Sequence, residues 1–81
     1  MAKKNTYSNQ QIKNLGKRLR ALRKEKGFSS AEKFAYQHDI NRVQYSRYEQ
    51  GNDLRFSSLT KVLKALDISL EDFFSEGFDE E

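Results

Sequence analysis

The sequence predicts an all-α fold built as one small domain. Apolar residues recur three and four positions apart along most of the chain, which is the spacing of a helix face buried against its neighbours. Proline is absent, and serine, asparagine and glycine stand where helices would begin and end. The 81 residues allow only a small core, and without cysteine no disulfide can support it. Helix packing must therefore stabilise the fold.

The first predicted helix follows a flexible arm, residues 1–9, which is polar and has no apolar period. Gly27 stops the helix. Its apolar positions are Ile12, Leu15, Leu19 and Leu22. Its outward positions are basic: Lys13, Lys17, Arg18, Arg20 and Lys24. Such a basic face is most simply a solvated surface.

A second helix is predicted to open at Ser29 or Ser30, because either hydroxyl can cap exposed amide groups. It buries Phe34 and Ala35 and ends at a sharp turn. Asp39 lies in that turn, where a left-handed backbone conformation is commonly needed and aspartate tolerates it. The second helix is therefore short and is followed at once by a third.

The third helix is predicted to start after Asn41, whose side chain can act as N-cap, and to run to about Gln50 before Gly51. We expect Tyr45 and Tyr48, which are one turn apart, to face inward. We expect Ile40 to pack into the core beneath the turn. Two short helices hinged in this way form a helix-turn-helix.

A fourth helix is predicted after the loop of residues 52–56, with Ser57 or Ser58 as its cap. Its apolar stripe is Leu59, Val62, Leu63 and Leu66. Ser69 caps a short fifth helix with Leu70, Phe73 and Phe74 as its apolar residues. We therefore expect a folded domain over residues 10–75 and an acidic, mobile tail over residues 76–81.

Charge is distributed very unevenly along the chain. Residues 1–26 carry nine Lys/Arg and one Glu, a net +8, whereas residues 67–81 carry seven carboxylates and no base, a net −7. The segment between them has six basic and four acidic residues, so the whole chain is at +3. A basic body suits attraction to nucleic acid, and the tail either keeps the protein soluble or screens non-specific contacts.

The outer face of the third helix carries the side chains suited to reading double-stranded DNA: Arg42, Val43, Gln44 and Arg47. Arginine offers two donors to guanine O6 and N7, glutamine can bridge adenine N6 and N7, and valine can touch a thymine methyl group. We expect Arg42 to be the leading base contact and Gln44 the least certain. Each of these side chains could instead bind only phosphate or solvent.

These residues resemble the helix-turn-helix domain of phage repressor and Cro proteins, the XRE family. The resemblance lies in residues 15–23, 30–51 and 59–74, and it is most specific in the pair Phe34-Ala35 and in the stretch from Ile40 to Gly51. It implies a five-helix, lambda-repressor-like domain that binds operator DNA, commonly as a two-fold dimer, with its third helix in the major groove. The expected function is therefore that of a sequence-specific transcriptional regulator.

The resemblance also implies how the domain holds the DNA backbone. Asn41 would lie at the entrance of the recognition helix, Ser30 and Ser57 at helix starts rich in free amides, and Asn52 and Arg55 in the loop before the fourth helix. We expect these five residues to contact phosphates. The family often grips a phosphate with glutamine at the position of Ala31, so that anchor is missing here.

Arg23 and Glu49 match positions that form a buried ion pair in some members of the family. Removing one partner of such a pair leaves an uncompensated buried charge, which is costly. We therefore expect this pair to support folding rather than binding.

Dimerisation is expected from the resemblance and from apolar residues near the C-terminus that exceed what a small core needs. These candidates are Leu70, Phe73, Phe74 and Phe78. An alternative uses the same region, or the acidic tail, to bind a different protein, as the antitoxin of a toxin pair would. Co-purification of a stoichiometric protein partner would favour this alternative.

Other classes of function fit the sequence poorly. His38 is the chain's one histidine, so neither a metal site nor a catalytic triad can be assembled around it, and a capping or half-buried role is favoured over a pH switch. We expect no enzyme activity and no cofactor. Stacking on single-stranded nucleic acid is disfavoured, because the tyrosine spacing indicates core and groove edge. No apolar run could span a membrane, and a cytoplasmic location is expected.

Overall fold

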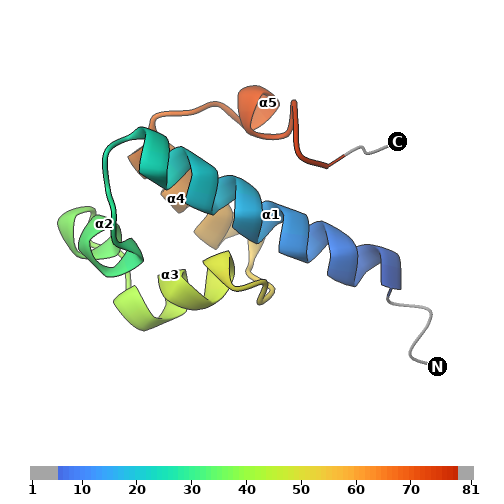
Figure 1. Ribbon diagram of the computed structural model, residues 1–81, viewed down its shortest axis with the longest axis horizontal. Helices are drawn as coiled ribbons and strands as arrows, with labels where there is room; N and C mark the ends of the chain where they lie inside the picture. Colours follow the sequence, from blue (N-terminus) through green and yellow to red (C-terminus); the bar gives the residue numbers. More distant parts are fainter. Residues whose placement is uncertain (1–5, 79–81) are drawn as a thin grey trace.

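The computed structural model describes residues 6–78, and these form five helices with no strand among them. The helices are α1 (Thr6–Glu25), α2 (Ala31–Gln37), α3 (Arg42–Glu49), α4 (Phe56–Leu66) and α5 (Leu70–Phe73). The long helix α1 runs through the length of the molecule, with α3 and α5 on opposite sides of it (Figure 1). The predicted all-α class and the order of five helices are confirmed.

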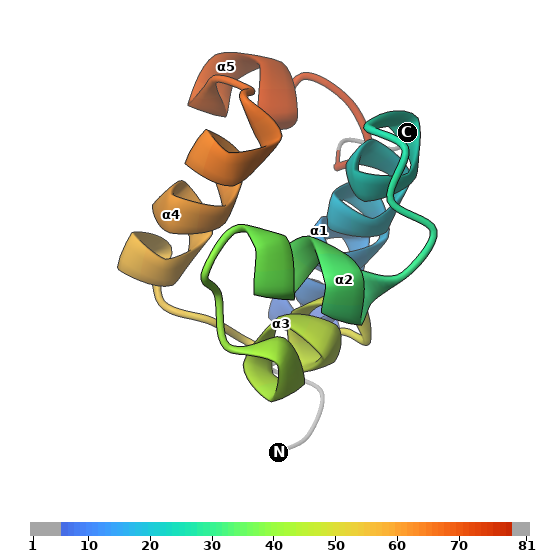
Figure 2. The ribbon, with the colours of Figure 1, turned by 90° about the vertical axis from the view of Figure 1, so that its left-hand side faces the viewer.

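Every helix contributes to a single core. Figure 2 shows α2 and α3 as an adjoining pair, with α4 to the left of them and α5 above α4. The buried apolar residues are Leu19, Phe34, Ala35, Tyr45, Leu59, Val62, Leu63, Leu66 and Phe73. All four residues of the stripe predicted for the fourth helix are among them. Burying apolar surface at about 25 cal/mol per Å² is what holds so short a chain together.

Three of the predicted N-caps are present. The side-chain oxygen of Ser30 accepts a hydrogen bond from Lys33 N (3.2 Å), that of Asn41 from Gln44 N (2.9 Å) and that of Ser69 from Asp72 N (3.0 Å). The predicted left-handed turn is also present, since Asp39 has φ 60°. These caps fix where α2, α3 and α5 begin.

The cap predicted for the fourth helix is wrong. The N-cap is Arg55, two residues before Ser57, and it has an extended conformation without a side-chain cap hydrogen bond, so the helix begins at Phe56. Ser57 lies inside the first turn, where its carbonyl oxygen accepts a hydrogen bond from Thr60 Oγ1 (2.9 Å). The first amides of α4 are thus left without a side-chain cap.

The predicted arm of residues 1–9 is too long, because α1 begins at Thr6. Neither glycine nor proline interrupts residues 6–9, so the helix extends through these polar positions. Hydrogen bonds between side chains one turn apart also support the first part of α1. Gln10 Nε2 donates to Asn14 Oδ1 (3.1 Å), and Asn14 Nδ2 donates to Gln11 Oε1 (3.2 Å). Residues 1–5, the rest of the predicted arm, lie outside the described residues.

The start of the predicted mobile tail is held against α1. Arg18 contacts the side chain of Glu76 (3.1 Å) and donates to the carbonyl oxygens of Asp72 and Phe73, both at 2.9 Å. Phe78 packs against the core, and its carbonyl oxygen accepts from Gln11 Nε2 (3.3 Å). Burial of an aromatic ring explains why this segment is ordered despite its charge. Residues 79–81, the end of the predicted tail, lie outside the described residues.

Candidate nucleic-acid interface

Helix α3 lies very close to α1, and Gly16 makes this possible. A Cβ atom at Gly16 would lie 2.6 Å from the carbonyl oxygen of Tyr48 and 2.8 Å from that of Glu49. Both atoms belong to the backbone and cannot swing away, so a side chain at this position would push the two helices apart. The sequence showed only an isolated glycine, and nothing local in it signals a crossing with a helix thirty residues later.

Arg23 and Glu49 fix the C-terminal end of α3. The guanidinium donates to both carboxylate oxygens, with Nε–Oε2 at 2.8 Å and Nη2–Oε1 at 2.9 Å, and a further bond of 2.8 Å reaches the carbonyl oxygen of Phe28. The two side chains are only 5% and 8% exposed. The hydrogen bond to Glu49 raises the pKa of Arg23, which therefore stays charged. One arginine thus links α1, α3 and the loop before α2.

Tyr45 anchors the middle of α3 in the core. Its ring is fully buried and lies 5.1 Å, centroid to centroid, from that of Phe34. Within the described residues its hydroxyl has no hydrogen-bond partner. Burial raises the pKa of Tyr45 well above its usual value, and the neighbouring Glu49 carboxylate adds to the rise. The inner side of α3 is therefore held rigidly while its outer side is free.

The outer side of α3 presents the four predicted base-reading residues. Arg42, Val43, Gln44 and Arg47 are all exposed, and Val43 is 62% exposed although it is apolar. Arg42, Val43 and Arg47 line one shallow pocket of about 430 Å³. The fold brings these side chains onto one accessible surface. Their contacts with bases remain predictions.

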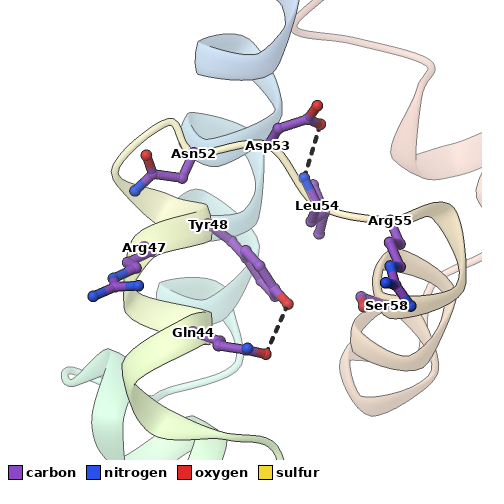
Figure 3. A pocket seen from close by; sticks show the side chains of 8 residues that line it. All are labelled: Gln44, Arg47, Tyr48, Asn52, Asp53, Leu54, Arg55 and Ser58. Carbon is purple, nitrogen blue, oxygen red and sulfur yellow. Dashed lines mark hydrogen bonds between the residues drawn. The ribbon is translucent and has the colours of Figure 1, made fainter.

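Gln44 and Arg47 also line a wider groove between α3 and α4, with a volume of about 780 Å³. Figure 3 shows Gln44 and Tyr48 pointing into this space and Arg47 pointing away from it. Tyr48 Oη donates a long hydrogen bond, 3.5 Å, to Gln44 Oε1. This leaves the amide nitrogen of Gln44 free to donate elsewhere.

Of the five predicted phosphate-contacting residues, Asn52 and Arg55 line the same groove, on the loop that joins α3 to α4 (Figure 3). Ser57 lies beside them in the first turn of α4 and is exposed. Ser30 and Asn41 use their side-chain oxygens as caps for α2 and α3, so any phosphate they meet would bind chiefly through backbone amides. These contacts too remain predictions.

Glu32 is a residue that the sequence reasoning missed. One of its carboxylate oxygens accepts from Ser30 Oγ (3.1 Å) and the other from Ser46 Oγ (3.3 Å), so it ties the start of α2 to α3. A hydrogen bond from its own backbone amide, followed by those hydroxyls, lowers the pKa of Glu32. Its helix position alone did not reveal a partner fourteen residues away.

His38 is the C-cap residue of α2 and is half-buried, as the favoured interpretation predicted. Its ring lies 4.8 Å from that of Phe34 and 5.8 Å from that of Phe28. Among residues 6–78, no group of three histidine, cysteine, aspartate or glutamate side chains could hold a metal ion. In the same range no helix is long and apolar enough to cross a membrane.

Comparison with known proteins decides the family. Residues 19–73, more than half of the chain, match the helix-turn-helix family. The chain belongs to this helix-turn-helix family. One relative, "Control protein C.MunI" from Mycoplasma sp, is 40% identical over 62 residues, which cover 75% of this chain and 84% of the relative. No solved structure matches the chain.

Family membership makes the chain a DNA-binding protein of the transcription-regulator class, with the Cro/C1-type helix-turn-helix that the sequence predicted. The predicted resemblance is confirmed. Proteins of this family are typically not enzymes. The exposed outer face of α3 is therefore the candidate surface for binding DNA.

Proposed function

We propose that this regulator occupies a specific double-stranded operator by placing the outer face of α3 in the major groove. The observation that supports this most strongly is the contrast between the two sides of α3. Tyr45 is fully buried on one side, whereas Arg42, Val43, Gln44 and Arg47 are exposed on the other. A rigid helix with hydrogen-bonding side chains on its free face is what direct base readout needs.

The backbone of the operator would be held on both sides of α3. On one side lie the amides at the start of α2, near Ser30. On the other lie Asn52, Arg55 and the uncapped start of α4, around Ser57. Free amides and a helix dipole favour phosphate oxygens, and arginine adds a full positive charge. These contacts would set the register in which α3 meets the bases.

We propose further that the protein acts as a homodimer in the cytoplasm, where a two-fold dimer would read two half-sites. An apolar groove of about 390 Å³ between the first half of α1 and the C-terminal segment supports this. Phe74 lines it and remains 43% exposed. Phe73, one of the predicted interface residues, is fully buried in the core and cannot contribute to an interface.

The name of the relative, a control protein, supports a role in controlling transcription. The comparisons favour this role over the alternative of an antitoxin. Whether the regulator represses or activates depends on where its operator lies relative to a promoter.

Selection of bound duplexes from a random pool tests the proposal. The wild-type protein should enrich one sequence with two related halves spaced by about one helical turn, 34–36 Å. Arg42→Ala should then lose about 1–3 kcal/mol of discrimination at one base pair of each half. Arg20→Ala removes the same charge from the outward face of α1 and serves as the matched control, with base preference unchanged. Equal binding of all duplexes at matched salt would refute specific readout.

A further inference from the structure

Tyr36 lies at the edge of the proposed reading surface without a role in the fold. It is on α2 and is 75% exposed, the highest exposure among the large hydrophobic residues that the structure describes. On the opposite side of the same helix, Phe34 and Ala35 are fully buried. With most of its surface in solvent, the ring is free to contact an exposed neighbouring side chain or a ligand.

The guanidinium of Arg42 lies over the ring of Tyr36. Arg42 Cζ lies 5.7 Å from the ring centroid, within the range of a cation–π contact. Arg42 is the first residue of α3, and it is exposed. The turn between α2 and α3 thus places the ring of Tyr36, on α2, beside Arg42, the leading candidate for a base contact, on α3.

No other group competes strongly for this guanidinium. One acidic residue, Glu32, lines the same pocket of about 310 Å³ as Tyr36 and Arg42. Both of its carboxylate oxygens already accept hydrogen bonds, one from the hydroxyl of Ser30 and the other from that of Ser46. Within residues 6–78 the structure gives Arg42 no ion pair. The aromatic ring is therefore what restrains the Arg42 side chain.

We infer that Tyr36 is a specificity-determining positioning residue, which holds Arg42 in the orientation that reads its base. This rests on the proposed function. An arginine loses side-chain freedom when it forms two parallel bonds to guanine, and a side chain already ordered on an aromatic ring loses less. Tyr36 thus raises the discrimination that Arg42 achieves, in addition to any contact of its own with the duplex.

The neighbouring residues allow a matched comparison. Lys33 and Gln37 line the same pocket, one turn before Tyr36 and directly after it, and both are exposed. Lys33 offers a point charge that suits phosphate and carries no information on sequence. Lys33→Ala should therefore weaken binding to every duplex by a similar factor and leave base preference unchanged.

The test measures dissociation constants of the full chain for its selected duplex and for duplexes changed at single base pairs. The variants are Tyr36→Ala, Tyr36→Phe, Arg42→Ala, Lys33→Ala and the double variant Tyr36→Ala/Arg42→Ala. Circular dichroism checks each fold, which an exposed site should leave intact. Tyr36→Ala should lose about two- to fivefold in discrimination at the one base pair that Arg42→Ala also affects. Tyr36→Phe keeps the ring and should keep the preference.

The double variant should discriminate no worse than Arg42→Ala alone, because the effect of Tyr36 passes through Arg42. A uniform loss in Tyr36→Ala would show that Tyr36 contributes only to sequence-independent binding and would overturn the inference. Equal losses in Tyr36→Phe and Tyr36→Ala would show that the hydroxyl, not the ring, is responsible and would overturn it as well. Additive losses in the double variant would overturn it too. A wild-type protein without base preference would overturn the proposed function, and this inference with it.

Discussion

At the scale of single residues, the ion pair of Arg23 and Glu49 is the clearest contribution to stability. Their two hydrogen bonds of 2.8 and 2.9 Å are buried, so neither charge can turn to water if its partner is removed. Arg23→Ala should lower the free energy of unfolding by about 3–5 kcal/mol. Urea unfolding measures this, and Arg20→Ala, an exposed arginine on the same helix, is the control. Equal stability of the two variants would contradict the structural role of the pair.

Tyr45 should make stability depend on alkaline pH. Its pKa is raised in the folded protein by burial, whereas an unfolded tyrosine ionises near about pH 10. Below that pH both states keep the proton and the raised pKa has no effect. Above it the unfolded state gains by losing its proton, so stability falls as pH rises. Tyr45→Phe should show a smaller loss between about pH 9 and 11 than the wild-type protein, measured by urea unfolding.

At pH 7 the same Tyr45→Phe variant should be as stable as the wild-type protein or slightly more stable. The hydroxyl it removes is buried and has no hydrogen-bond partner within the described residues. A loss of stability at neutral pH would show that this hydroxyl is hydrogen-bonded after all. Parallel pH profiles of the two proteins would contradict the shifted pKa.

At the scale of helices, the contact of α1 with α3 at Gly16 decides where the recognition helix lies. Gly16→Ala would place a Cβ within 2.6 Å of a backbone oxygen, and overpacking of this kind costs about 1–3 kcal/mol. The variant should unfold at lower urea concentration and bind duplex DNA less tightly. Lys17→Ala, at an exposed position next to it, should change neither property. Unchanged stability in Gly16→Ala would show that the helices are not tightly packed there.

The elements show which features a sequence alone can predict. The stripe from Leu59 to Leu66 and the caps at Ser30 and Asn41 follow from local periodicity and local hydrogen bonding, and both were predicted. The start of α4 was misplaced because Arg55 has no side-chain bond to mark it. Gly16 was missed because its partner carbonyls lie on another helix.

The candidate site likewise has features that the sequence predicted and features that it did not. The exposed face of α3 was predicted residue by residue, because the spacing of Tyr45 and Tyr48 fixes which side of the helix is inward. The contact of Tyr36 with Arg42 and the bridge through Glu32 were not predicted. Both depend on the angle between α2 and α3, which only the folded structure supplies. Phe78 likewise needed the fold, since its partner Gln11 lies at the other end of the chain.

The whole molecule combines a basic body with an acidic end, and binding should respond strongly to salt. If about 6–10 phosphates are contacted, affinity should fall about 10³–10⁵-fold between 50 and 200 mM salt. Arg55→Ala should reduce the slope of log affinity against log salt by about one, since one phosphate contact is lost. Fluorescence anisotropy across a salt series measures both. An unchanged slope would remove Arg55 from the backbone contacts.

Assembly of the molecule depends on the apolar groove beside the C-terminal segment. Phe74→Asp would place a charge there and should convert a concentration-dependent dimer into a monomer by sedimentation. Phe56→Asp, at a more exposed aromatic residue outside this groove, is the control and should sediment like the wild-type protein. A wild-type protein that remains monomeric at all concentrations, with and without DNA, would contradict the proposed dimer.

The central claim is that the outer face of α3 lies against the bases of a duplex. Titrating the labelled protein with its selected duplex and following backbone amide chemical shifts tests this most directly. The largest changes should fall within residues 41–48, with smaller ones at the starts of α2 and α4. Changes confined to the basic outward face of α1, with α3 unaffected, would contradict the account.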